Sequence, residues 1–253
     1  RGAIRIYRGG MPWRGVPVMA ALATYKRPEL ARRCVESLRP HVDDVIVVEG
    51  VSPAFVARNR AIERVPDDAI VFLVDDDCYY DASLRLDRSL PFLTHAVGVI
   101  QVAQKPAGST WLEPPDPGRI WSHPFHWLAG GFLFRRRTWL EVGMVPDEIQ
   151  DDVAFTMAHY VRGYTNLSST LSWGFHDAGT CEGGMFASEV FAASDVSRWG
   201  LSGKTYAKPW GQVAMGTDHI ASTAHRQHDD ERRRRFGDVQ PWFEGEPCTL
   251  VSR

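Results

Sequence analysis

Residues 16–40, VPVMAALATYKRPELARRCVESLRP, read as a strand, a loop and a helix. Residues 16–23 are nearly all apolar, as in a strand that is covered on both faces. Pro28 suits the first turn of a helix, and apolar residues then recur at helical spacing until Pro40 ends the pattern. A buried strand followed directly by an amphipathic helix is typical of a βαβ unit.

The same unit repeats as far as residue 80. Residues 43–50, DDVIVVEG, predict a second buried strand. Residues 52–65 predict a second helix with Ser52 as its N-cap and Pro53 at its first position. Residues 69–77, AIVFLVDDD, predict a third strand. This spacing indicates right-handed crossovers, so we predict an α/β fold with a mostly parallel sheet flanked by helices.

The rest of the chain is less regular. The pattern predicts strands at residues 96–104 and 165–176, a short strand and helix within 127–143, and an amphipathic helix within 147–164. From residue 180 to the end the sequence reads as irregular. Residues 104–125, rich in Pro, Gly and Trp, predict a functional loop.

Composition limits the class of protein. The 253 residues are 44% hydrophobic and 24% charged with a net charge of −2, which is typical of a soluble globular domain and gives no general attraction to nucleic acid. No apolar run is long enough to span a membrane and no signal peptide opens the chain, so we predict a cytoplasmic protein, or one of the host cytoplasm if it is viral. Four scattered cysteines (Cys34, Cys78, Cys181, Cys248) predict free thiols in a reducing compartment. The oligomeric state cannot be predicted.

Three adjacent carboxylates, Asp75, Asp76 and Asp77, follow the third predicted strand. Like charges repel, so this cluster needs a counter-charge. Open parallel sheets bind ligands beyond the carboxyl ends of their strands, and such acids suit Mn²⁺ or Mg²⁺ completed by phosphate oxygens. Asp75 and Asp77 occupy alternate positions, so they are expected to point the same way along an extended strand. The alternative is a solvated turn with helix-capping acids.

Five motifs occur in a specific order: TYKRPE, ARNRAI, FLVDDDCYYDASL, AGGFLFRRRTWLEVGMVPDE and QDDVAFTMAHYVRGY. Together they resemble the inverting, family-2-like nucleotide-sugar glycosyltransferases of the GT-A fold, whose DXD region the acid cluster matches. The resemblance covers residues 16–176. It implies a catalytic domain at residues 1–184. We predict that residues 185–253 form a C-terminal extension packed on the same domain and available for the acceptor.

The resemblance also implies roles for individual residues. Asp152 would be the catalytic base, with Asp151 in place of the usual Glu, although acids at a helix start are also favourable for dipole reasons alone. Metal ligands would be Asp77, Asp75 and His176, holding Mn²⁺ or Mg²⁺. The implied donor is a nucleotide-sugar, and more specifically a UDP-sugar, bound by Thr24, Tyr25, Arg27, Glu49, Arg58, Asn59, Asp75, Asp76, Gly130 and Gly131. Glu49 departs from the more usual Asp, and the two glycines could simply permit a tight turn.

The chemistry is coherent without the resemblance. A cation stabilises a diphosphate leaving group, and a carboxylate on the opposite side deprotonates the attacking hydroxyl, which favours inversion over double displacement. His219, His225 and His228 rival His176 as ligands. A nucleotidyltransferase and a non-catalytic nucleic-acid or sugar-binding module remain alternatives.

The acceptor stays open among a DNA-base hydroxyl, a glycan or lipid-linked sugar, and a small molecule. Some phage-type GT-A enzymes glycosylate hydroxymethylated DNA bases. Lys204, Tyr206, Lys208, Trp210 and residues 232–235 mix basic and aromatic side chains, as binders of single-stranded or flipped bases do. The arginine run at 232–235 could equally be a solvated helix face. If DNA is the acceptor, this run and the basic residues 1–14 are expected to flank one mouth of the donor crevice.

Overall fold

The computed structural model describes residues 3–8, 13, 15–106, 118, 120–122, 131–142, 151–176 and 222–237. Its strands are β1 (Ala3–Arg8), β2 (Val18–Thr24), β3 (Asp44–Glu49), β4 (Ile70–Asp75), β5 (Cys78–Tyr79), β6 (Val97–Pro106), β7 (Ile120–Ser122), β8 (Phe132–Arg135) and β9 (Thr165–His176). Its helices are α1 (Pro28–Leu38), α2 (Ala54–Ile62), α3 (Leu86–Ser89), the 3₁₀ turn η1 (Leu90–Phe92), α4 (Arg136–Val142), α5 (Asp151–Tyr160) and α7 (Ser222–Phe236). Of the predicted functional loop, residues 107–117, 119 and 123–125 lie outside the described part.

All nine strands belong to one sheet with the order β1-β3-β2-β4-β8-β6-β9-β5, and β7 pairs with β9. β2 pairs in parallel with β3 and β4, and β6 pairs in parallel with β9. The remaining pairings are antiparallel. β2, β3, β4, β6 and β9 therefore run in one direction, and they include the two longest strands. The predicted α/β fold with a mostly parallel sheet is confirmed.

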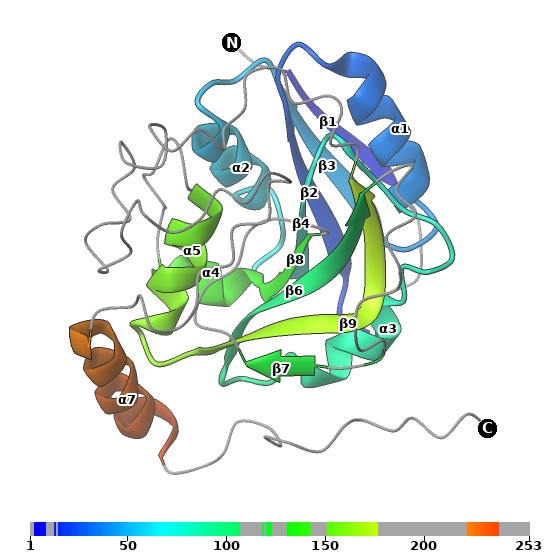
Figure 1. Ribbon diagram of the computed structural model, residues 1–253. Coiled ribbons are helices and arrows are strands. Elements are labelled where there is room, and N and C mark those ends of the chain that lie inside the picture. Colours follow the sequence, from blue (N-terminus) through cyan, green and yellow to red (C-terminus); the bar gives the residue numbers. More distant parts are fainter. Residues whose placement is uncertain are drawn as a thin grey trace.

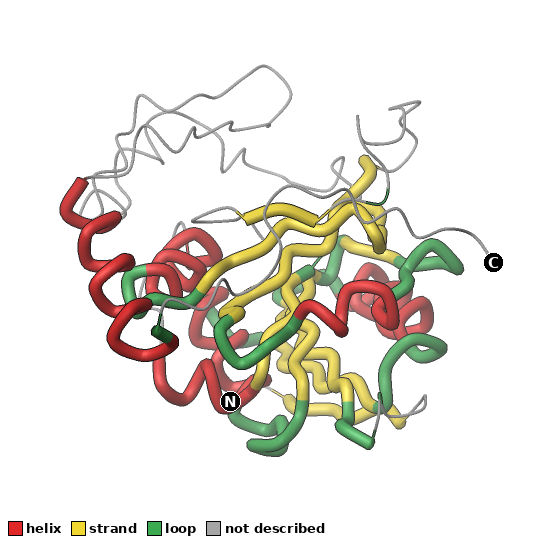
Figure 2. The backbone as a smooth tube through the Cα atoms, turned by 90° about the horizontal axis from the view of Figure 1, so that it is seen from below, coloured by secondary structure: helices red, strands yellow, loops and turns green. Residues whose placement is uncertain are grey.

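Helices cover both faces of the sheet, which is seen as a curved layer between them (Figures 1 and 2). The alternation along β2 produces this arrangement, because successive side chains point to opposite faces. Leu22 packs in one apolar cluster with Leu38 of α1, whereas Ala21 packs in the other with Ile62 of α2 and Phe155 of α5. β2 is buried on both sides, which explains why its sequence is apolar almost throughout.

Two details of the first helices and strands were predicted wrongly. Ser52 is not an N-cap, because the second helix begins at Ala54 and no side chain caps it. Pro53, expected at the first helical position, is extended at φ −71° and ψ 171° and occupies the capping position itself. The strand β1 was not predicted. It pairs antiparallel with β3 at the edge of the sheet, where Ile6 is 59% exposed, and it lacks the continuous apolar run of the central strands.

The helix α7 lies inside the stretch that was expected to be irregular, and it packs against α5 and the turn that follows it. The hydroxyl of Tyr160 lies 2.8 Å from His225 Nδ1, and the ring of His228 stacks on Tyr160 with centroids 3.9 Å apart. Arg235 pairs with Glu141 at 2.5 Å. These contacts order a helix whose sequence is mostly polar. None of the helices in the described part is long and apolar enough to cross a membrane.

Gly163 controls how closely α7 can approach. Its φ is +83°, and a Cβ there would lie 2.3 Å from the backbone nitrogen of Arg232. We expect Gly163→Ala to push α7 away, which hydrogen exchange or limited trypsin cleavage within α7 would detect as a rise of at least about tenfold. Gly15→Ala is the matched control, because Gly15 has φ +81° and nothing within 4 Å of the added Cβ. It should cost only about 1 kcal/mol of backbone strain and leave α7 protected. Equal protection of α7 in both variants would contradict the prediction.

Candidate active site

The carboxyl ends of three parallel strands meet at one edge of the sheet. The register pairs Thr24 with Glu49 on the neighbouring strand, and Ala23 with Asp75 on the other side. Gly50, which donates its N–H to the carbonyl of Thr24 at 3.0 Å, closes the end of β3. The carboxyl ends of β2, β3 and β4 therefore lie side by side.

Arginines supply most of the counter-charge to the acid cluster. Arg58 of α2 lies with Nη2 2.5 Å from Asp75 Oδ1. Arg27, in the loop after β2, places Nη2 2.5 Å from Asp76 Oδ1 and Nε 3.2 Å from Asp76 Oδ2. Its Nη1 donates to Asp77 Oδ2 at 3.1 Å. Thr24 donates its hydroxyl to Asp76 Oδ2 at 2.7 Å.

The expected shared direction of Asp75 and Asp77 is wrong, because β4 ends at Asp75 and a turn takes its place. Asp75 turns to Arg58 on α2, whereas Asp77 turns to Arg27 and to His176 at the end of β9. The chain reverses so tightly that Cys78 already pairs with His176. Asp75 and Asp77 therefore have different partners, and a metal role for Asp75 stays a prediction.

Asp77 and His176 present two possible metal ligands to each other. His176 Nε2 lies 3.4 Å from Asp77 Oδ1, an oxygen that is buried and makes no hydrogen bond of good geometry. Two ligands of one octahedral ion at about 2.1 Å lie about 3 Å apart, so the pair fits a cation between them. The described residues contain no group of three or more His, Cys, Asp or Glu side chains arranged around a metal. Water molecules, or the oxygens of a bound diphosphate, would complete the coordination.

Burial and charge act on these acids in opposite ways. Burial raises the pKa of Asp76 to about 6, although Thr24 and Arg27 favour its ionised form. Burial also works against ionisation of Asp77, but His176 and Arg27 outweigh it and the pKa of Asp77 falls below its ordinary value. Asp77 is thus charged at neutral pH, as a ligand for a hard cation must be.

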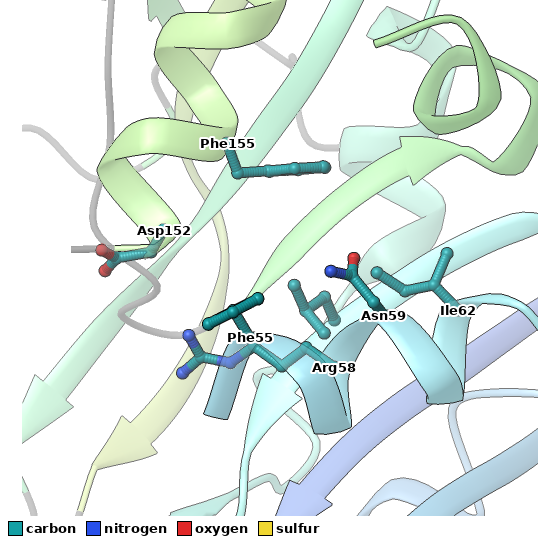
Figure 3. A pocket seen from close by; sticks show the side chains of 7 residues that line it. Phe55, Arg58, Asn59, Ile62, Asp152 and Phe155 are labelled. Atoms are coloured by element: carbon teal, nitrogen blue, oxygen red, sulfur yellow. The ribbon is translucent and has the colours of Figure 1, made fainter. Parts of the chain in front are cut away.

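A small pocket with a volume of about 20 Å³ lies between α2 and α5, and Arg58 in its lining pairs with Asp75 of the acid cluster. Arg58 and Asn59 line it from α2, and Asp152 lines it from the start of α5 (Figure 3). The guanidinium end of Arg58 and the carboxylate of Asp152 lie on the same side of this pocket (Figure 3). The structure therefore brings the predicted base close to the residue that holds Asp75.

The sequence did not single out the apolar lining of this pocket, which is Phe55, Ile62, Leu73 and Phe155. These residues read as core positions of helices and strands, and Leu73 and Phe155 are indeed buried. Asn59 is also buried, and its Oδ1 accepts from Trp139 Nε1 at 3.3 Å. Its place in the pocket lining agrees with the expected position of this residue, while a contact with nucleotide stays a prediction.

Other residues that were predicted to bind the nucleotide-sugar lie at the carboxyl ends of the same strands or pack below them. Tyr25 is 48% exposed beside Thr24, with Lys26 Nζ 5.0 Å from its ring centroid. Gly131 has φ +119°, and a Cβ there would lie 2.4 Å from the ring of Phe72. Close packing on Phe72 is thus sufficient reason for a glycine, and a contact with donor stays a prediction. Gly130, His219 and the side chain of Asp151 lie outside the described residues.

The rival candidates on α7 have other partners. His225 and His228 both pack against Tyr160, and of the candidate histidines in the described part His176 meets the acid cluster. In the arginine run, Arg234 pairs with Glu231 and Arg233 lies 3.9 Å from Asp230. Of the four cysteines, Cys34 and Cys78 are buried free thiols, while Cys181 and Cys248 lie outside the described part.

Comparison with known proteins identifies the fold. No protein-family profile and no curated protein sequence matches the chain. GalNAc-T7, solved with UDP, GalNAc and Mn²⁺, superposes with a TM-score of 0.52 at 11% identity, over 85% of this chain and 54% of that one. TarS of S. aureus gives 0.50 at 13% identity, over 88% and 44% of the two chains. TarS residues 1–349 in complex with UDP-GlcNAc give 0.50 at 13%, over 71% and 68%.

These structures are GT-A glycosyltransferases, so the predicted GT-A fold is confirmed. The chain spans about half the length of GalNAc-T7 and less than half of full-length TarS. At these identities the likeness establishes the fold alone.

Proposed function

We propose that the chain is a metal-dependent, inverting glycosyltransferase that moves a sugar from a UDP-sugar to an acceptor hydroxyl. The observation that carries the proposal is the facing pair Asp77 and His176, beside a pocket that holds Asp152. The Asp75–Arg58 ion pair links the two, because Asp75 lies two residues before Asp77 and Arg58 lines the pocket of Asp152. GalNAc-T7 was solved with UDP and Mn²⁺ and TarS with UDP-GlcNAc, which supports the same ligands here.

In this proposal each group has a distinct task. A divalent cation, when bound, stabilises the diphosphate leaving group. Asp77 and His176 hold that cation, and Thr24, Tyr25 and Glu49 border the place of the nucleoside. Asp152 takes the proton of the acceptor hydroxyl as it attacks the anomeric carbon. Because no covalent intermediate is needed, the anomeric configuration inverts in one displacement.

Screening nucleotide-sugars by thermal shift, with and without Mn²⁺, tests donor use, since a ligand that binds only the folded chain raises its Tm. We expect a UDP-sugar to raise the Tm more in Mn²⁺ than in EDTA, and slow release of UDP to accompany the shift. A nucleotidyltransferase would instead release pyrophosphate from a nucleoside triphosphate. A binding module would show the shift without product. Proton NMR of the transferred sugar then reads the anomeric configuration, and retention would exclude Asp152 as the base of a single displacement.

A hydroxymethylated DNA base gains no support from the two basic segments. β1, from the basic N-terminal segment, lies at the upper right in Figure 1, whereas α7 lies at the lower left. Filter binding to modified and unmodified duplexes at two salt concentrations tests this acceptor, because phosphate contacts release counterions. The informative variant is Arg233→Ala with Arg234→Ala, since it leaves Arg235 to hold Glu141. Absence of binding at low salt would direct the search to glycans and small molecules.

A further inference from the structure

Asp76 is the most enclosed of the three clustered acids, with 1% of its surface exposed. Both of its oxygens face protein groups: Oδ2 accepts hydrogen bonds from the hydroxyl of Thr24 and from Arg27 Nε, whereas Oδ1 lies 2.5 Å from Arg27 Nη2 in an ion pair without a hydrogen bond of good geometry. A side chain in this position cannot easily reach a ligand in the crevice. Its surroundings suggest that its task is to hold Arg27.

Arg27 in turn acts on Asp77. The guanidinium group is a rigid planar fork, so fixing Nε and Nη2 on Asp76 also fixes the direction of Nη1. Nη1 donates to Asp77 Oδ2 at 3.1 Å, and this leaves Oδ1 directed at His176 Nε2. The order of contacts is therefore Thr24, Asp76, Arg27, Asp77 and His176, with each group oriented by the one before it.

We propose that Asp76 is a positioning residue that, through Arg27, orients the Asp77 carboxylate toward His176, instead of contacting the donor itself. The inference rests on the proposed function in one respect, namely that Asp77 and His176 hold the cation. Groups that orient metal ligands typically change metal affinity by about 10–100-fold when they are removed. Arg27 would then strengthen the binding of the cation, although both carry positive charge.

The sign of that effect separates orientation from simple electrostatics. Arg27→Gln removes a positive charge close to the cation, so Coulomb repulsion alone predicts tighter Mn²⁺ binding. Orientation predicts binding that is about 10–100-fold weaker. Thr24→Val changes no charge, so electrostatics predicts no effect, whereas loss of the hydroxyl should loosen Asp76 and weaken Mn²⁺ binding by a few-fold.

The experiment is a titration of the whole chain with Mn²⁺ alone, followed by calorimetry or by EPR of the free ion. Arg27→Gln, Thr24→Val and Asp76→Asn are compared with Asp43→Asn as the control. Asp43 accepts the N–H of Val18 at 2.8 Å near the opposite end of β2, so its loss should leave Mn²⁺ affinity unchanged. Tighter binding by Arg27→Gln, or unchanged binding by both Thr24→Val and Asp76→Asn, would overturn the proposal.

Two further measurements test the role of Asp76 independently of the proposed function. UDP binding in EDTA should be unchanged in Asp76→Asn, and a loss there would make Asp76 a donor ligand and overturn the proposal. A crystal structure of Asp76→Asn should show Asp77 turned away from His176. If the unaltered chain bound no Mn²⁺, metal use would fail, yet this crystal structure would still decide whether Asp76 orients Asp77.

Discussion

Asp152→Asn is expected to lower the rate of sugar transfer by about 10²–10⁴-fold, which is the usual contribution of a general base. The amide keeps the shape of the side chain but cannot take the proton of the acceptor hydroxyl. Binding of the UDP-sugar in the presence of Mn²⁺ should be preserved, because Asp77 and His176 are unaltered. The loss should therefore fall on kcat, measured as UDP release with acceptor at saturating donor.

Asp151→Asn is the comparison variant, because Asp151 and Asp152 both lie in the first turn of α5. Each carboxylate there stabilises the helix start by about 0.3–1 kcal/mol, so both variants should lose the same small amount of stability. Asp152 lines the pocket together with Arg58, whereas the side chain of Asp151 lies outside the described part. Undiminished transfer by Asp152→Asn together with a loss in Asp151→Asn would move the role of base to Asp151.

The sheet could be predicted from the sequence because its central strands carry continuous apolar runs. β2, β3 and β4 are buried almost throughout, as their apolar sequences predict. β1 and α7 could not be predicted in this way. β1 gains its place from pairing with β3, and α7 from contacts with Tyr160, Gly163 and Glu141 that are distant in sequence.

The candidate site shows a similar division. Three adjacent carboxylates predicted that a positive group must lie beside them. Their position after a predicted strand indicated that this group lies at the carboxyl ends of the parallel strands. Which groups these are depends on the turn after Asp75, which separates the partners of Asp75 from those of Asp77. An alternation argument assumes that the strand continues to Asp77, and here β4 ends two residues before it. Arg27 was predicted to contact donor, but its contacts with Asp76 and Asp77 have no signal in a single sequence.

Asp77→Asn is expected to weaken Mn²⁺ binding by more than about 100-fold, since a direct ligand should matter more than the groups that orient it. Metal-dependent binding of the UDP-sugar should be lost with it, measured as the difference in Kd between Mn²⁺ and EDTA. The fold should persist, because Arg27 keeps Asp76 as its partner after the substitution. Asp87→Asn is the control, since Asp87 also pairs with an arginine, Arg85 at 2.9 Å, but on the exposed surface near α3.

His176→Ala distinguishes a ligand from a group that merely sits beside one. Asp77 alone would still attract the cation, so the loss of donor binding in His176→Ala should shrink as the Mn²⁺ concentration rises. In Asp77→Asn, by contrast, the same concentrations should restore little, because the charged ligand is missing. A defect in His176→Ala that excess Mn²⁺ does not reduce would mean that His176 is not a ligand. Its role would then be to maintain the pairing of β5 with β9, where it lies opposite Cys78. Asp77 and the diphosphate would bind the cation without it.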